Sequence, residues 1–135
     1  MRDLQPREII QGWLSRARSD LNLGKSAMHI QGVLLDDACY HAQQCVEKAL
    51  KGLLTHYQIP FPRTHVLEAL LDLIKNNGID VPINVDKAYK LTQYAVQTRY
   101  PGEWEPVSKN ETKQALESAR LVLTWVEEKI KYDKP

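Results

Sequence analysis

The sequence has little of what marks exported and metal-binding proteins. Only two of its 135 residues are cysteines, Cys39 and Cys45, and they lie within one segment of helical periodicity. Six helical steps place two side chains about 240° apart around the axis, so these cysteines cannot bridge each other. No cysteine or histidine pair has zinc-finger spacing either. We therefore expect no metal site, and two buried thiols in a reducing, cytoplasmic compartment.

Long apolar runs and a net charge are also missing. No stretch approaches the roughly 20 apolar residues that cross a bilayer, and the chain starts without a signal-peptide run, so we expect neither export nor a membrane partner. Eighteen basic and 17 acidic residues leave a net charge of +1. Any contact with nucleic acid would need a local basic cluster, because no global positive field exists.

The composition is that of an ordinary folded domain. Apolar residues make up 43% and charged residues 26%, and six glycines and seven prolines are too few for a disordered or collagen-like chain. The length fits one unit, so we expect residues 1–135 to form a single helical domain.

Apolar residues recur three and four positions apart almost throughout, which predicts an all-α fold. The first helix is expected from Pro6 to about 30–32, and the second from 35 to 57. Thr64 is placed to cap a third helix that Asn77-Gly78 stops, and Asn84 to cap a fourth that ends before residue 101. Ser108 and Glu111, spaced as a capping box, open the last helix, which extends to about residue 130.

Amphipathic helices with short links pack most simply as an up-and-down four-helix bundle with an additional short helix. The third helix is predicted to be that short one, lying across an end or flank.

Known catalytic templates are absent: there is no GxGxxG, Walker lysine loop, HExxH or G-x-S-x-G elbow. The second helix is more informative, because it carries polar residues on the side opposite its apolar stripe and along one edge. These residues are Tyr40, Gln44, Glu47 and Lys51, with His41, Lys48 and Thr55 at the edge. One interpretation is a Glu47–Lys51 helical pair beside a half-buried His41. The other is a partner surface formed by Tyr40, His41 and the glutamines.

Two further segments are candidates. His65 follows Thr64, the predicted cap of the third helix, and it has either a structural or a catalytic role there. Arg99 and Tyr100, with Trp104 close behind, stand at a helix-to-loop junction. Arg99 either caps that helix or grips a phosphate or a partner carboxylate, with Tyr100 or Trp104 stacking on a base or on the guanidinium.

In combination, several blocks resemble the HEPN domain family, a helical module often encoded beside small nucleotidyltransferases. The blocks are residues 13–17 with Asp20 and Leu21, residues 38–51, Thr64-His65 with Leu67, and residues 99–101. The resemblance spans nearly the whole chain. It implies an α-helical bundle, frequently homodimeric, that acts as a toxin-type ribonuclease or as a noncatalytic partner binding nucleotide or protein.

The ribonuclease branch of that family uses an arginine followed, after four to six intervening residues, by a histidine. After Arg99 those positions hold Trp104, Glu105 and Pro106, and no other arginine does better. Cleavage at a 2′-hydroxyl benefits from a proton carrier that titrates near neutral pH, which tryptophan and proline cannot supply.

The resemblance therefore favours a homodimeric partner of a small nucleotidyltransferase in a toxin–antitoxin-like module, without a cofactor. Arg99 would hold a phosphate or partner carboxylate, Lys48 and Lys51 would add positive charge, and Tyr100 would accept a nucleotidyl group if the partner modifies tyrosine. The expected nucleotide- or partner-binding residues are Arg99, Tyr100, Trp104, Tyr40, His41, Gln44, Lys48, Lys51 and His65. The alternatives are a metal-independent endoribonuclease acting on RNA, in which His65 or Glu103 moves protons, and a scaffold without ligand.

Overall fold

The computed structural model describes residues 3–95, 102, 103 and 105–135, and all regular structure in that part of the chain is helical. The elements are α1 (Pro6–Ala27), α2 (Leu35–His56), α3 (Leu67–Asn76), α4 (Ile83–Asp86), the 3₁₀ helix η1 (Lys87–Tyr94) and α5 (Lys109–Tyr132). The prediction of an all-α fold is confirmed.

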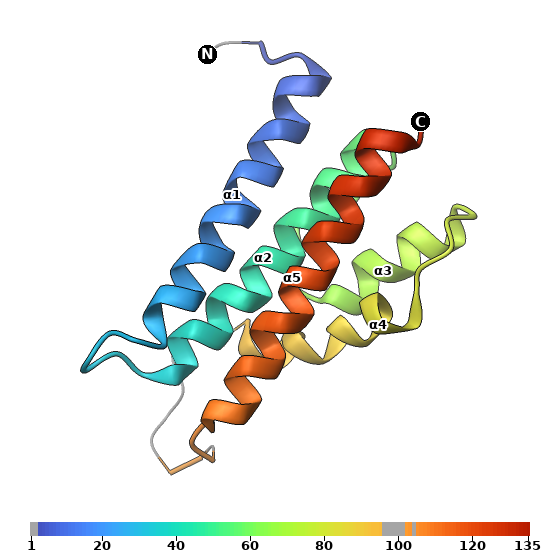
Figure 1. The fold of residues 1–135 in the computed structure, drawn as a ribbon. Coiled ribbons are helices and arrows are strands. Elements are labelled where there is room, and N and C mark those ends of the chain that lie inside the picture. Colours follow the sequence, from blue (N-terminus) through green and yellow to red (C-terminus); the bar gives the residue numbers. More distant parts are fainter. Residues whose placement is uncertain (1–2, 96–101, 104) are drawn as a thin grey trace.

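Helix α2 is the centre of the molecule (Figure 1). It packs between α1 and α5, and it also contacts α3 and η1. The short elements α3, α4 and η1 lie on the side of α2 and α5 away from α1, where they take the place of a fourth long helix. No position of α2 is exposed, so even its polar side is covered.

Small residues let α1 and α2 approach closely. Ala38, Ala42 and Ala49 of α2 are fully buried. A β-carbon on Gly24 of α1 would lie only 2.8 Å from Leu116 Cδ2 and 3.1 Å from the Ala38 carbonyl oxygen. Helix packing at this point therefore requires glycine.

The fourth predicted helix differs from the observed one. An α-helix capped by Asn84 was expected, but α4 starts at Ile83 after Pro82 and becomes the 3₁₀ helix η1 at Lys87. The buried residues of this stretch, Val85, Ala88, Leu91 and Tyr94, recur every third position. A helix of three residues per turn aligns that stripe on one side, whereas an α-helix would rotate it out of the core.

The predicted cap of the third helix was also wrong. Helix α3 begins at Leu67 after Val66, and the Thr64 hydroxyl accepts the Val66 N–H at 3.1 Å in a turn before the helix. The Leu67 N–H donates instead to Thr92 Oγ1 of η1 at 3.1 Å. The stop at Asn77 and Gly78 is confirmed, and Gly78 has a φ of +80°.

The other helix ends lie closer to their predicted positions. Helix α1 has Pro6 in its first turn as expected but ends at Ala27, before the predicted 30–32. Ser108 caps α5 by accepting the Glu111 N–H at 3.0 Å. The Glu111 carboxylate accepts the Tyr94 hydroxyl, so it ties η1 to α5.

Both cysteines are buried thiols that form no disulfide, as predicted. Within the described residues, no helix has the length and apolar character needed to span a bilayer.

Candidate functional site

The polar side of α2 holds two buried carboxylate clusters. The helix presents His41, Gln44, Lys48 and Lys51 at spacings of three and four residues, which brings them onto one face. Burying charged groups is costly unless each finds an opposite charge or a hydrogen bond. The neighbours that cover this face supply those partners from α1 and from the segment before α3.

The first cluster, the Asp20 cluster, joins α1 to α2 and consists of Asp20, His41 and Lys48. Asp20 is only 8% exposed although it stands in the apolar stripe of α1. Its Oδ1 lies 2.9 Å from His41 Nδ1, and its Oδ2 accepts Lys48 Nζ at 2.5 Å. One carboxylate thus fixes two side chains of α2, which reach the molecular surface beside it with a fifth to a quarter of each exposed.

The second cluster, the Glu47 cluster, consists of Glu47, Lys51, His65 and Gln43. The carboxylate of Glu47 lies 2.9 Å from Lys51 Nζ and 2.8 Å from His65 Nδ1, and accepts Gln43 Nε2 at 3.3 Å. Burial by itself would raise the pKa of Glu47, but the hydrogen bonds from His65 and Lys51 outweigh it and leave that pKa below its ordinary value. Glu47 is therefore ionised at neutral pH.

His65 is held by its buried partner and open on its other side. Glu47 is 5% exposed in its side chain and His65 is 69% exposed. An ionised carboxylate can only accept, so Nδ1 of His65 carries the proton and Nε2 of the neutral ring holds the free lone pair. Within the described residues, Nε2 has no hydrogen-bond partner. Glu47 thus orients the His65 ring, and Nε2 of that ring is placed to accept a proton from a bound molecule.

Aromatic rings close over Lys51. Its ammonium lies 5.8 Å from the centre of the Trp13 ring and 6.0 Å from that of Phe61, and these rings meet edge to face. Lys48 and Lys51 are both paired with buried carboxylates, so their charges are balanced inside the protein.

The other predicted residues of α2 take supporting positions. Tyr40 contacts His41 edge to face, with ring centres 5.2 Å apart. Gln44 is buried and donates from Nε2 to Gln43 Oε1 at 2.7 Å, and Gln43 in turn donates to the His65 carbonyl at 3.1 Å. The predicted Arg99, Tyr100 and Trp104 lie outside the described residues.

Comparison with known proteins identifies the family. The HEPN domain family matches residues 10–129. The chain belongs to the HEPN family. It is 30% identical over 134 residues to the Methanocaldococcus jannaschii protein named "Putative toxin MJ1304", an alignment that covers 88% of this chain and 86% of that protein. It is also similar to the crystal structure of ST0689, an archaeal HEPN homologue, with a TM-score of 0.72 at 26% identity over 90% of this chain and 97% of that one.

The HEPN match contains both carboxylate clusters, and sequence reasoning missed the role of Asp20. Asp20 was noted only within the resemblance, and Gln43 was considered only as part of a partner surface. The predicted Glu47–Lys51 pair is confirmed. The available signal was an acid at a position of α1 that faces the core, since Asp is almost never buried without a partner. The described part of this HEPN chain contains no group of three or more His, Cys, Asp or Glu side chains able to hold a metal ion.

Proposed function

We propose that this HEPN chain is the helical subunit of a two-component, toxin–antitoxin-like module, working as a homodimer with a small nucleotidyltransferase as its partner. The observation that carries the proposal is its similarity to the protein named "Putative toxin MJ1304" along 86% of that protein's length. The absence of a histidine at the expected distance after any arginine favours a binding role over cleavage.

In this role Arg99 holds a phosphate or a carboxylate of the partner, and Tyr100 is the group that a nucleotidyltransferase would modify. The paired state of Lys48 and Lys51 supports this assignment, because their charges are already balanced by Asp20 and Glu47. A guanidinium can bind an anion through two parallel hydrogen bonds, which suits the role assigned to Arg99 better than that of a lysine already held by a carboxylate.

The test starts from the open reading frame next to the gene of this chain, which the proposal expects to encode a small nucleotidyltransferase, and co-expresses the two proteins. We expect the two proteins to copurify, the helical subunit to have the mass of a dimer by light scattering, and Arg99→Ala to weaken the complex about tenfold or more. Mass spectrometry after incubation with the partner and ATP would show a nucleotidyl adduct that Tyr100→Phe prevents. A monomeric chain that does not bind the nucleotidyltransferase would contradict the proposal.

A metal-independent endoribonuclease is the second candidate, and the His65–Glu47 pair favours it. In this reaction Nε2 of His65 takes the proton of an RNA 2′-hydroxyl, the 2′-oxygen attacks phosphorus, and the 5′-oxygen leaves with a proton from solvent. Glu47 positions the ring and stabilises the imidazolium that forms.

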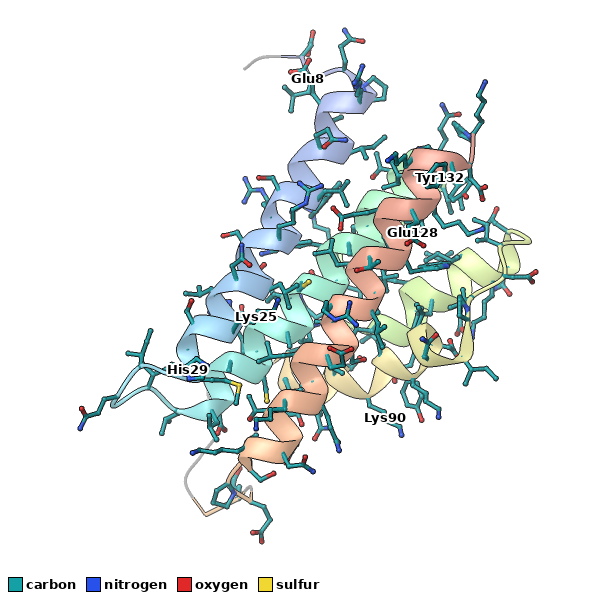
Figure 2. The ribbon with its side chains drawn as sticks, viewed as in Figure 1. Glu8, Lys25, His29, Lys90, Glu128 and Tyr132 are labelled. Atoms are coloured by element: carbon teal, nitrogen blue, oxygen red, sulfur yellow. The ribbon has the colours of Figure 1, made fainter. Side chains whose placement is uncertain are left out.

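Incubation of the purified chain with RNA in EDTA separates the two candidates. If the second holds, His65→Ala abolishes cleavage and Glu47→Gln reduces it, while His29→Ala, an exposed histidine at the turn after α1, leaves it unchanged (Figure 2). RNA left intact by the wild-type chain would exclude the endoribonuclease.

A further inference from the structure

A groove of about 670 Å³ runs between η1 and α5, on the side of the molecule away from α1. Leu91 of η1 and Ala115 and Leu121 of α5 supply its apolar lining. Polar side chains of both helices form the edges, among them Gln93 and Gln114. The groove is separate from the Asp20 and Glu47 clusters, none of whose residues lines it.

The 3₁₀ conformation sets the charge along one edge. Side chains three residues apart eclipse one another in a 3₁₀ helix. Lys87, Lys90 and Gln93 of η1 have that spacing, and all three line the groove. Lys113 lines it from α5. In an α-helix, side chains three residues apart differ by about 60° around the axis. These three side chains would then not form one continuous edge.

The groove keeps more unbalanced positive than negative charge, because its three lysines have no ionic partner among the described residues. Lys87, Lys90 and Lys113 are exposed and form no ion pair within residues 3–95, 102, 103 and 105–135. Of the two acids beside them, Glu117 is neutralised by Arg120 through two hydrogen bonds, whereas Glu111 accepts the uncharged Tyr94 hydroxyl and keeps its charge. The groove therefore combines an apolar floor with an excess of positive charge, in a chain whose net charge is only +1.

We propose that this groove docks an acidic amphipathic helix of a partner protein, whose apolar ridge lies on Leu91, Ala115 and Leu121 and whose carboxylates meet Lys87, Lys90 and Lys113. A helix laid in a groove presents apolar side chains along one line and charges beside it, which matches the floor and edges here. The proposal rests on the proposed function of the chain as a subunit, and it assigns the surface through which that subunit binds its partner.

The decisive variant is Lys87→Glu with Lys90→Glu, which reverses the charge of one edge without touching the core. The matched control is Lys25→Glu with Lys131→Glu, an equal change of charge at exposed sites outside the groove. Lys25 and Lys90 lie on opposite sides of α5 (Figure 2). The first probe is a fluorescent helical peptide with a leucine ridge flanked by glutamates, compared with the same peptide flanked by lysines. The second is the small nucleotidyltransferase that the proposed function expects as partner.

We expect the full-length chain to bind the glutamate peptide over the lysine peptide. The groove variant should weaken that binding about tenfold or more while the control does not. The same pattern is expected for the nucleotidyltransferase. Circular dichroism of both variants checks that the fold is retained.

Equal affinity for the two peptides, or equal loss in both variants, would overturn the docking site. A nucleotidyltransferase that binds the groove variant normally would also overturn it while leaving the proposed function standing. Peptide binding that depends on the groove, together with no binding of the nucleotidyltransferase, would retain the site and refute the proposed partner. Self-association that the groove variant abolishes would assign the groove to a second copy of this chain, and would contradict the proposal.

Discussion

Two buried carboxylates organise the polar side chains of this protein. Asp20 and Glu47 each bind two or more side chains, and together they fix both histidines of the candidate site. A carboxylate enclosed in this way is more important for the orientation of its partners than for net stability, since its hydrogen bonds must first compensate for lost hydration.

Stability should depend on the charge of Glu47. Its pKa is lowered in the folded state, so its contribution is present above the ordinary value of 4.5 and is lost as the pH falls below that value toward the folded pKa. Glu47→Gln leaves Lys51 buried without its counter-charge, and we expect a loss of about 3 kcal/mol at pH 7. The stability of the variant should also fall less than that of the wild type when the pH is lowered.

Urea denaturation at pH 7 and at pH 3.5 measures both effects. Glu117→Gln is the control, because its ion pair with Arg120 is exposed and should contribute little. A Glu47→Gln protein as stable as wild type at pH 7 would show that the cluster does not support the fold.

At the scale of elements, close helix approach and the capping of α3 depend on single residues. Helix α1 carries glycines at 12 and 24 in contrasting surroundings. A β-carbon at Gly24 would meet Leu116 and the Ala38 backbone, whereas at Gly12 it would meet nothing within 4 Å.

We expect Gly24→Ala to destabilise the protein by about 1–3 kcal/mol, because α1 must move away from α2. Gly12→Ala should instead stabilise it by up to about 1 kcal/mol through helix propensity. Thermal unfolding of the two variants checks this, and a shift of the same sign in both would contradict the packing argument.

Thr92 performs the capping that Thr64 does not. Its hydroxyl accepts the Leu67 N–H and donates to Glu68 at 2.8 Å, so it joins η1 to the start of α3. Thr92→Val should cost about 1 kcal/mol, as loss of a helix cap does. Thr124→Val, on an exposed position of α5, should leave the urea midpoint nearly unchanged. Equal effects of the two substitutions would refute the cap.

At the scale of the whole molecule, the fold buries both thiols behind several helices. Cys39 and Cys45 are fully buried, and burial raises the pKa of Cys45 to about 12. Neither thiol has the exposed, electropositive surroundings of a reactive cysteine.

Reaction with Ellman's reagent should therefore follow global unfolding. We expect no thiol to react in native buffer at pH 8, and both to react with the same midpoint in urea as the loss of helical signal. Fast reaction of one thiol in native buffer would indicate a local opening around α2.

The all-α class, the three long helices and the buried stripe of α2 could be predicted from the sequence, because helical periodicity and capping residues are local properties. Pro6, Ser108 and the Asn77-Gly78 stop acted as expected for the same reason. The family was also readable from the sequence, since its blocks are contiguous.

The pairing of polar groups that are far apart in the sequence was set by the packing of the helices. Asp20 and Lys48 are 28 residues apart, and Glu47 and His65 are 18 apart, so their pairing depends on how α1 and the segment before α3 pack on α2. The 3₁₀ form of η1 was likewise decided by packing, since its stripe of every third residue must face the core. Sequence spacing predicts the faces of a helix, but the partner of each face is fixed by the rest of the fold.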